Sequence, residues 1–178
     1  MGRPKHLLPW RRTTLAEHLV GLLEPHVDAV AFLGAGHLPP SLSDRLRIED
    51  DPTVSGPLSG ILSALRTEPH AQEGAWLIVG CDLPLVTSSA IQWLVAQRCA
   101  DARMIIPRDS LGFPQPHFSV FENHALASVQ RAVDGGLRSP SKLVNHPETL
   151  SPSLPSWVES ELINVNSPDD LLALKEAL

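Results

Sequence analysis

Short apolar stretches alternate with helical segments along almost the whole chain, and this alternation constrains the fold more than any other feature. Segments of strand character occur at 27–33, 46–49, 75–80, 103–107, 116–121 and 162–165. Segments of helical character occur at 15–23, 56–66, 87–95, 123–133 and 168–178. Such alternation predicts an α/β fold, a Rossmann-like, doubly wound and mostly parallel sheet with helices on both faces. We expect ligands at the carboxyl ends of its strands.

Capping residues mark several of the expected helix boundaries. Thr14 and Glu17 have the spacing of a capping box, and Pro25 ends the helical pattern that follows them. Ser167 precedes a proline at the first helical position and acidic residues in the first turn, which predicts the N-cap of a terminal helix. The segment 135–155 is rich in glycine, proline and serine, and we expect a long mobile loop there.

Composition restricts the class of protein. A length of 178 residues fits one domain over residues 1–178, and no apolar run approaches the roughly 20 residues of a membrane span. A net charge of -6 with scattered basic residues argues against a nucleic-acid surface. No apolar signal core follows Met1, which predicts a cytoplasmic protein. Cys81 and Cys99 lack metal or redox spacing, and we expect both to be free packing residues.

Asp82 is the strongest single candidate for chemistry. It lies in Gly80-Cys81-Asp82-Leu83-Pro84, just past the most apolar strand segment, where Pro84 prevents the strand from continuing. A carboxylate at the end of a buried strand can bind Mg²⁺ together with substrate phosphates. The alternative is an aspartate that closes the turn or caps the next helix.

Three further residues have the chemistry of a phosphate or nucleotide site. The ammonium of Lys5, held next to Pro4, can act as a point charge toward a polyphosphate, although lysines near a terminus are often merely solvated. Asp50 follows the second strand segment, and Gly56 opens a stretch whose glycines permit close approach of a ligand to a helix start. Helix capping is the alternative for this stretch.

Candidates for an acceptor site lie near the carboxyl end. Asn164 and Asn166 flank Val165 at the period of a strand, so that both amides are expected to point the same way and either bind a ligand or close a turn. Arg138, in the expected mobile loop, can meet a phosphorylated acceptor or remain a solvated surface residue.

Five blocks together resemble the molybdenum cofactor guanylyltransferases. They are Met-Gly-Arg-Pro-Lys-His-Leu-Leu-Pro at 1–9, Gly-Pro-Leu-Ser-Gly-Ile at 56–61, Gly-Cys-Asp-Leu-Pro at 80–84, Gln-Pro-His-Phe at 115–118 and Ile-Asn-Val-Asn-Ser-Pro-Asp-Asp-Leu at 163–171. The resemblance implies transfer of GMP from GTP to molybdopterin with release of pyrophosphate.

The same resemblance implies roles for single residues. Lys5 would contact the triphosphate, Asp50 would contact the nucleotide, and Asp82 would contact the nucleotide and Mg²⁺. Asn164 and Asn166 match asparagines near the acceptor. Transient contact with molybdoenzymes or their chaperones would follow.

The chain departs from the family pattern in two places. That pattern has Leu-Ala-Gly-Gly-x-Ser-x-Arg directly before the Met-Gly at residues 1–2, and it has an asparagine that is not evident around Gly34-Ala35-Gly36. We therefore expect a domain without the first strand and the glycine-rich loop, and an incomplete nucleotide pocket. The alternatives are a cytidylyltransferase for the same pterin, a sugar-phosphate nucleotidyltransferase, or an inactive homologue that binds pterin or a partner.

Overall fold

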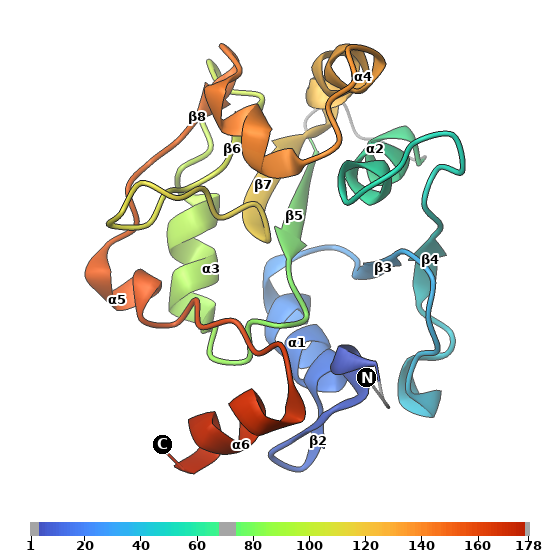
Figure 1. Cartoon of the computed structure of the whole chain (residues 1–178), viewed down its shortest axis with the longest axis vertical. Helices are drawn as coiled ribbons and strands as arrows, with labels where there is room; N and C mark the ends of the chain where they lie inside the picture. The colour runs from blue at the N-terminus through green and yellow to red at the C-terminus, as the bar shows by residue number, and fades with distance from the viewer. Residues whose placement is uncertain (1–3, 68–73, 177–178) are drawn as a thin grey trace.

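A four-stranded mixed sheet forms the centre of the computed structural model, which describes residues 4–67 and 74–176 (Figure 1). The strand order is β5-β7-β6-β8. These strands are β5 (Ala75–Val79), β6 (Met104–Ile105), β7 (Phe118–Glu122) and β8 (Thr149–Leu150). β7 runs antiparallel to β5 and β6, whereas β6 and β8 are parallel.

Two smaller strand pairs and the helices surround this sheet. β1 (Pro9–Trp10) pairs antiparallel with β2 (Thr13–Thr14), and β3 (Ala31–Leu33) pairs parallel with β4 (Leu46–Ile48). The α-helices are α1 (Leu15–Leu23), α2 (Leu58–Arg66), α3 (Ser88–Val95), α4 (Leu126–Asp134), α5 (Ser156–Glu159) and α6 (Pro168–Glu176). The 3-10 turns are η1 (Lys5–Leu7), η2 (Glu24–His26), η3 (Pro40–Leu42), η4 (Asn123–Ala125) and η5 (Pro140–Asn145). No helix within the described ranges is both long enough and apolar enough to span a membrane.

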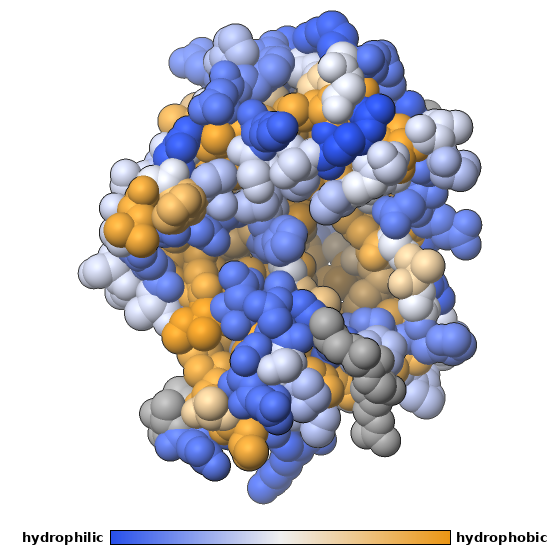
Figure 2. Space-filling view, in the orientation of Figure 1, coloured by the Kyte–Doolittle hydropathy of each residue, from blue (hydrophilic) through white to orange (hydrophobic). Residues whose placement is uncertain are grey.

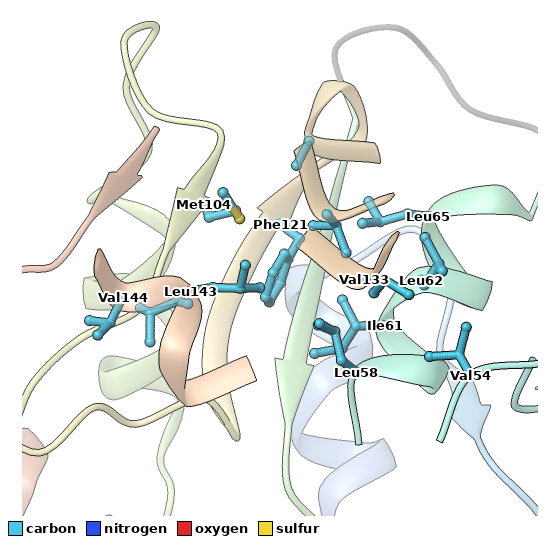
Figure 3. Close-up of a cluster of buried hydrophobic side chains, with 13 residues drawn as sticks. Val54, Leu58, Ile61, Leu62, Leu65, Met104, Phe121, Val133, Leu143 and Val144 are labelled. Atoms are coloured by element: carbon cyan, nitrogen blue, oxygen red, sulfur yellow. The ribbon is translucent and has the colours of Figure 1, made fainter. Parts of the chain in front are cut away.

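The expected α/β class with helices on both faces is confirmed, and β5 shows how it arises. Successive side chains of a strand point to opposite faces. Trp76 and Ile78 pack into a cluster with α2 and α4, whereas Ala75 and Leu77 pack into a second cluster with α3. Figure 3 shows the first cluster, with Phe121 of β7 between the side chains of α2 and those of η5.

The predicted helix caps are present. The Thr14 amide donates to the Glu17 carboxylate at 2.7 Å, and the Glu17 amide donates to the Thr14 hydroxyl at 3.2 Å, which forms the capping box of α1. At the start of α6, the amide of Asp170 donates to Ser167 Oγ at 3.1 Å, and the Asp170 carboxylate accepts from the Ser167 amide at 2.9 Å. Residues 1–3 and 177–178, which belong to the first motif and the last expected helix, lie outside the described residues.

The prediction of a mostly parallel sheet is wrong, because the segment after β6 reverses locally. Arg108 forms an antiparallel bridge with Pro114, and the Asp109 amide donates to the Phe113 carbonyl at 3.0 Å. Gly112, with a φ of 85°, supplies the left-handed conformation that this turn requires. β7 therefore returns beside β6 in the opposite direction without a crossover helix.

Three local expectations are also corrected. The segment 135–155 is not a long loop, because η5 buries Leu143 and Val144 and β8 pairs with β6. The segment 162–165 is not a strand. Its Val165 amide donates to the carbonyl of Asp82, in the turn after β5, at 2.8 Å. Cys81 and Cys99 are free as expected, but both are exposed rather than packed.

An open edge lies at the centre of the molecule. β5 was expected to be buried, yet all five of its residues are half-buried. Within the described ranges, β5 pairs with β7 on one edge and β3 pairs with β4 on one edge, and no strand pairs with the other edge of either. In the space-filling view of Figure 2, an apolar hollow lies in the region that Figure 1 places between β5 and the β3–β4 pair. A further strand that paired with β5 and β3 would fill this hollow.

We predict that an apolar strand and glycine-rich turn added ahead of residue 1 stabilises the domain. About four apolar side chains buried at ~1.5–3 kcal/mol each give an upper bound of roughly 6–12 kcal/mol. Urea unfolding of the chain with and without the extension measures the difference in midpoint. An extension of equal length with serine at the apolar positions is the control. Equal midpoints for the two extended chains would show that no strand docks in the hollow.

Candidate functional site

The site is built around the turn that follows β5. Gly80 and Cys81 separate β5 from Asp82, and the Leu83 amide closes the turn on the Gly80 carbonyl at 3.3 Å. The Asp82 side chain is 15% exposed, so its carboxylate is largely enclosed but still reaches solvent. The Asp82 carbonyl accepts the bond from Val165, which attaches the segment of the two asparagines to this turn. Asn164 and Asn166 are exposed on either side of the buried Val165.

Lys5 joins the same group. Its ammonium donates to Oδ1 of Asn166 at 2.7 Å. Although Cys81 is exposed to solvent, the atoms around its sulfur partly desolvate the thiol and raise its pKa. The Asp82 charge raises this pKa further and the Lys5 charge lowers it, so both charged groups lie near the thiol. The structure therefore brings Lys5 and the segment of Asn164 and Asn166 to the turn that holds Asp82.

Asn166 is itself fixed by the start of α6. Its backbone amide donates to Oδ2 of Asp170 at 2.8 Å. This bond is the largest cause that lowers the pKa of Asp170, followed by the bond between Asp170 and the Ser167 side chain. The carboxylate of the helix cap thus holds the backbone beside Lys5 in place.

His117 belongs to the site, although the sequence analysis gave it no role. The Gly80 amide donates to the His117 carbonyl at 2.7 Å, which continues the β5–β7 ladder to the turn. Nδ1 of His117 lies 4.0 Å from Oδ1 of Asp82. A Cβ atom on Gly80 would lie 2.4 Å from the same Asp82 oxygen and 3.0 Å from Cβ of His117. Glycine at position 80 is therefore what allows the Asp82 carboxylate to fold back toward β7.

A cavity of about 390 Å³ opens beside this group. Leu83, His117 and Asn164 line it on the side of the β5 turn. Pro57, from the start of α2, and the η5 region at 139–141 line it elsewhere. Its mixture of proline, hydroxyl, amide and imidazole groups suits a flat polar ligand with apolar faces.

The remaining predicted residues lie on the side of β3, β4 and α2. Asp50 follows β4, and Cβ atoms on Gly60 and Gly34 would lie 3.0 and 3.5 Å from its carboxylate oxygens. Gly56 has a φ of 91°, and a Cβ atom there would lie 3.1 Å from the carbonyl of Arg138. The Arg138 guanidinium donates to the carbonyls of Val133 and Leu137 at 2.7 and 2.8 Å, so it caps the end of α4. No direct contact joins Asp50 to Lys5 or Asp82 in the described residues.

The η1 turn links the two sides. Lys5 contacts Asn166 on the β5 side, whereas Nε2 of its neighbour His6 lies 2.6 Å from the carbonyl of His37. A Cβ atom on Gly36, in the turn after β3, would lie 3.3 Å from the His6 ring. Residues 5 and 6 therefore connect the turn after β3 to the asparagine segment beside Asp82.

The donors at Asp82 fit a hard divalent cation that is shared with a substrate. Within the described residues, no three His, Cys, Asp or Glu side chains converge to hold a metal by themselves. Mg²⁺ is commonly held by one or two protein carboxylates together with substrate phosphates and water. The enclosed Asp82 carboxylate, with the ammonium of Lys5 near the same turn, has the chemistry for such a shared site.

Comparison with known proteins gives consistent similarities. A model of the MobA-like NTP transferase domain matches residues 1–149. A molybdenum cofactor guanylyltransferase from Pseudomonas putida is 30% identical over 96% of this chain and 87% of its own length. A molybdenum cofactor biosynthesis bifunctional protein from Synechocystis is 28% identical over 96% of this chain, which spans 48% of that protein.

Solved structures show the same fold. Molybdopterin-guanine dinucleotide biosynthesis protein A from Archaeoglobus fulgidus has a TM-score of 0.74 and 20% identity, covering 99% of this chain and 91% of its own. A Mycobacterium tuberculosis protein in complex with manganese has a TM-score of 0.63 and 24% identity, covering 98% and 93%.

We predict that Gly80→Ala destabilises the domain, because the new methyl group collides with Asp82 and His117. Overpacking of this kind costs about 1–3 kcal/mol. Gly21→Ala is the matched control: Gly21 lies inside α1 with no atom within 4 Å of its would-be Cβ, and it should gain roughly 0.5–1 kcal/mol. Urea unfolding measures both variants. A Gly80→Ala domain as stable as the wild type would mean that the Asp82 carboxylate does not fold back as described.

Proposed function

Because the chain belongs to the MobA-like NTP transferase family, we propose that it transfers GMP from GTP to molybdopterin, with release of pyrophosphate. Relatives named molybdenum cofactor guanylyltransferase, matched over nearly the whole chain, support this substrate pair. The observation that carries the proposal is the contact of Lys5 with Asn166 beside the turn of Asp82. This contact joins the residue that we assign to phosphate to one that we assign to the acceptor, and the bond from the Val165 amide to the Asp82 carbonyl attaches both to the residue that we assign to the metal. The cytoplasm is the compartment that we expect for this activity.

The reaction is an in-line displacement at phosphorus. An oxygen of the terminal phosphate of the acceptor forms a bond to the α-phosphorus of GTP, the bond from that phosphorus to the oxygen bridging to the β-phosphate breaks, and pyrophosphate leaves with the electron pair. No nucleophile from the protein is needed, so positioning and charge stabilisation supply the catalysis. Lys5 would offset negative charge on the triphosphate.

Asp82 would hold the Mg²⁺ that this reaction requires. A bound Mg²⁺ would neutralise charge on the phosphoryl oxygens and on the leaving pyrophosphate. The carboxylate is suited to this role because Gly80 lets it fold back at the carboxyl end of β5 while it keeps contact with solvent.

The other predicted residues divide between donor and acceptor. Asp50 and Gly56, on the side of β3, β4 and α2, would bind the nucleotide. Asn164 and Asn166 would bind the acceptor in the cavity beside Asp82, which Asn164 lines. Arg138 directly precedes Ser139 of the cavity wall, and its guanidinium would have to leave its bonds to the carbonyls of Val133 and Leu137 to reach an acceptor there.

We predict that Asp82→Ala reduces GMP transfer by roughly a hundredfold or more while the fold is retained. The loss of a charge-stabilising contact costs on the order of 3 kcal/mol in the barrier. Transfer is measured with radiolabelled GTP in the N-terminally extended chain, and circular dichroism checks the fold. Cys81→Ala, at the exposed neighbouring position, is the control and should retain activity. Activity of Asp82→Ala within a few-fold of wild type would favour a purely turn-forming aspartate.

We also predict that GTP with Mg²⁺ raises the melting temperature of the extended chain more than CTP or ATP does. Ligand at a hundred times its dissociation constant adds about 2.7 kcal/mol of stability, enough for detection by thermal shift. A larger shift with CTP would favour a cytidylyltransferase. No shift with any nucleotide would favour the inactive, pterin- or partner-binding homologue.

A further inference from the structure

We infer that His117 is a second protein ligand of the divalent cation at Asp82, and that its imidazole shifts the preference of the site toward first-row transition metals. The inference rests on the proposed function in one respect, the placement of a divalent cation at Asp82. His117 belongs to the Gln-Pro-His-Phe block, which the proposed reaction leaves without a role.

The two side chains come from paired strands and are locked in register. Val79 of β5 lies opposite Phe118 of β7, and the bond from the Gly80 amide to the His117 carbonyl extends that pairing by one residue at 2.7 Å. Asp82 follows two residues later, and its carboxylate folds back over Gly80 toward His117. The sheet therefore sets the distance between imidazole and carboxylate before any ligand arrives.

That distance suits a shared metal ion. Nδ1 of His117 and Oδ1 of Asp82 are 4.0 Å apart, which is too long for a hydrogen bond. Two atoms that each lie about 2.1 Å from one metal ion are roughly 3–4.2 Å apart, depending on the angle between the bonds. A small rotation of either side chain closes this gap around an ion.

The imidazole is also free to bind. Its side chain is 54% exposed, and within the described part of the chain no hydrogen bond holds its ring. It lines the cavity together with Asn164, so the remaining coordination positions face space for water and phosphate oxygens. Gly80 leaves room for both ligands, since a Cβ atom there would lie 3.0 Å from Cβ of His117.

The choice of metal follows from the donors. Mg²⁺ prefers oxygen ligands and gives up its water reluctantly. Imidazole nitrogen suits Fe²⁺, Ni²⁺, Cu²⁺ and Zn²⁺ best, and Mn²⁺, the weakest binder of the first-row series, still accepts nitrogen more readily than Mg²⁺ does. A site with one carboxylate and one imidazole should therefore discriminate against Mg²⁺ more than a site with carboxylate alone.

Manganese alone, added to the full chain at a pH where imidazole is neutral, tests the inference. Electron spin echo envelope modulation detects ¹⁴N that is directly bonded to Mn²⁺. We expect nitrogen coupling in the wild type, its loss in His117→Ala, and a fall in Mn²⁺ affinity that exceeds the fall in Mg²⁺ affinity. Mg²⁺ affinity, measured by competition, should change less than about twofold, because Mg²⁺ gains little from imidazole.

The control is His124→Ala, which removes an exposed histidine in η4 beyond the opposite end of β7 and should leave the coupling intact. Three outcomes would overturn the inference: bound Mn²⁺ without nitrogen coupling, coupling that survives His117→Ala, or no binding of Mn²⁺ at all.

A second variant, Asp82→Asn, distinguishes failure of this inference from failure of the proposed function. If this variant loses Mn²⁺ but the wild type shows no nitrogen coupling, Asp82 remains the metal ligand and His117 alone is excluded. If Asp82→Asn binds Mn²⁺ as tightly as the wild type, the metal assignment of the proposed function fails.

Discussion

The antiparallel ladder between β5 and β7 is the interaction on which the rest of this structure depends. It runs from the Ala75–Glu122 pair to the Val79–Phe118 pair, and the bond from Gly80 to His117 continues it beyond the strand. Because backbone hydrogen bonds fix the register, the turn after β5 has a defined orientation. The Asp82 carbonyl then accepts the Val165 amide, so the sheet also positions the asparagine segment. The site is therefore an extension of the ladder.

The other half of the molecule is held less directly. The β3–β4 pair has its own parallel register but no strand partner shared with β5 in the described residues. α2 lies between the two halves: its buried face packs with β5, β7 and α4, and its Gly60 is close to both Leu33 and Asp50. η1 adds polar contacts through His6 and Lys5. Helix packing, rather than pairing of strands within one sheet, thus holds Asp50 in position beside the hollow.

Features fixed by local chemistry could be predicted from the sequence, whereas features fixed by distant contacts could not. The capping box of Thr14 and Glu17 and the position of Asp82 after an apolar strand depend on a few neighbouring residues. The direction of β7 depends on a reversal stabilised by Asp109 and Gly112, which alternation of strands and helices does not reveal. His117 was missed because its relation to Asp82 exists only in the paired strands.

The bond between Lys5 and Asn166 shows why this arrangement is ready for an anionic ligand. It joins a charged ammonium to a neutral amide on the surface, so it is charge-assisted on the donor side only. A polyphosphate would offer the same ammonium acceptor oxygens that carry negative charge, which adds Coulomb attraction to the hydrogen bond. Exchange of one partner for the other therefore releases Lys5 at small cost, while the Asn166 backbone stays fixed by Asp170. The Asn166 amide oxygen would then be available to a second ligand, which under the proposed function is the acceptor.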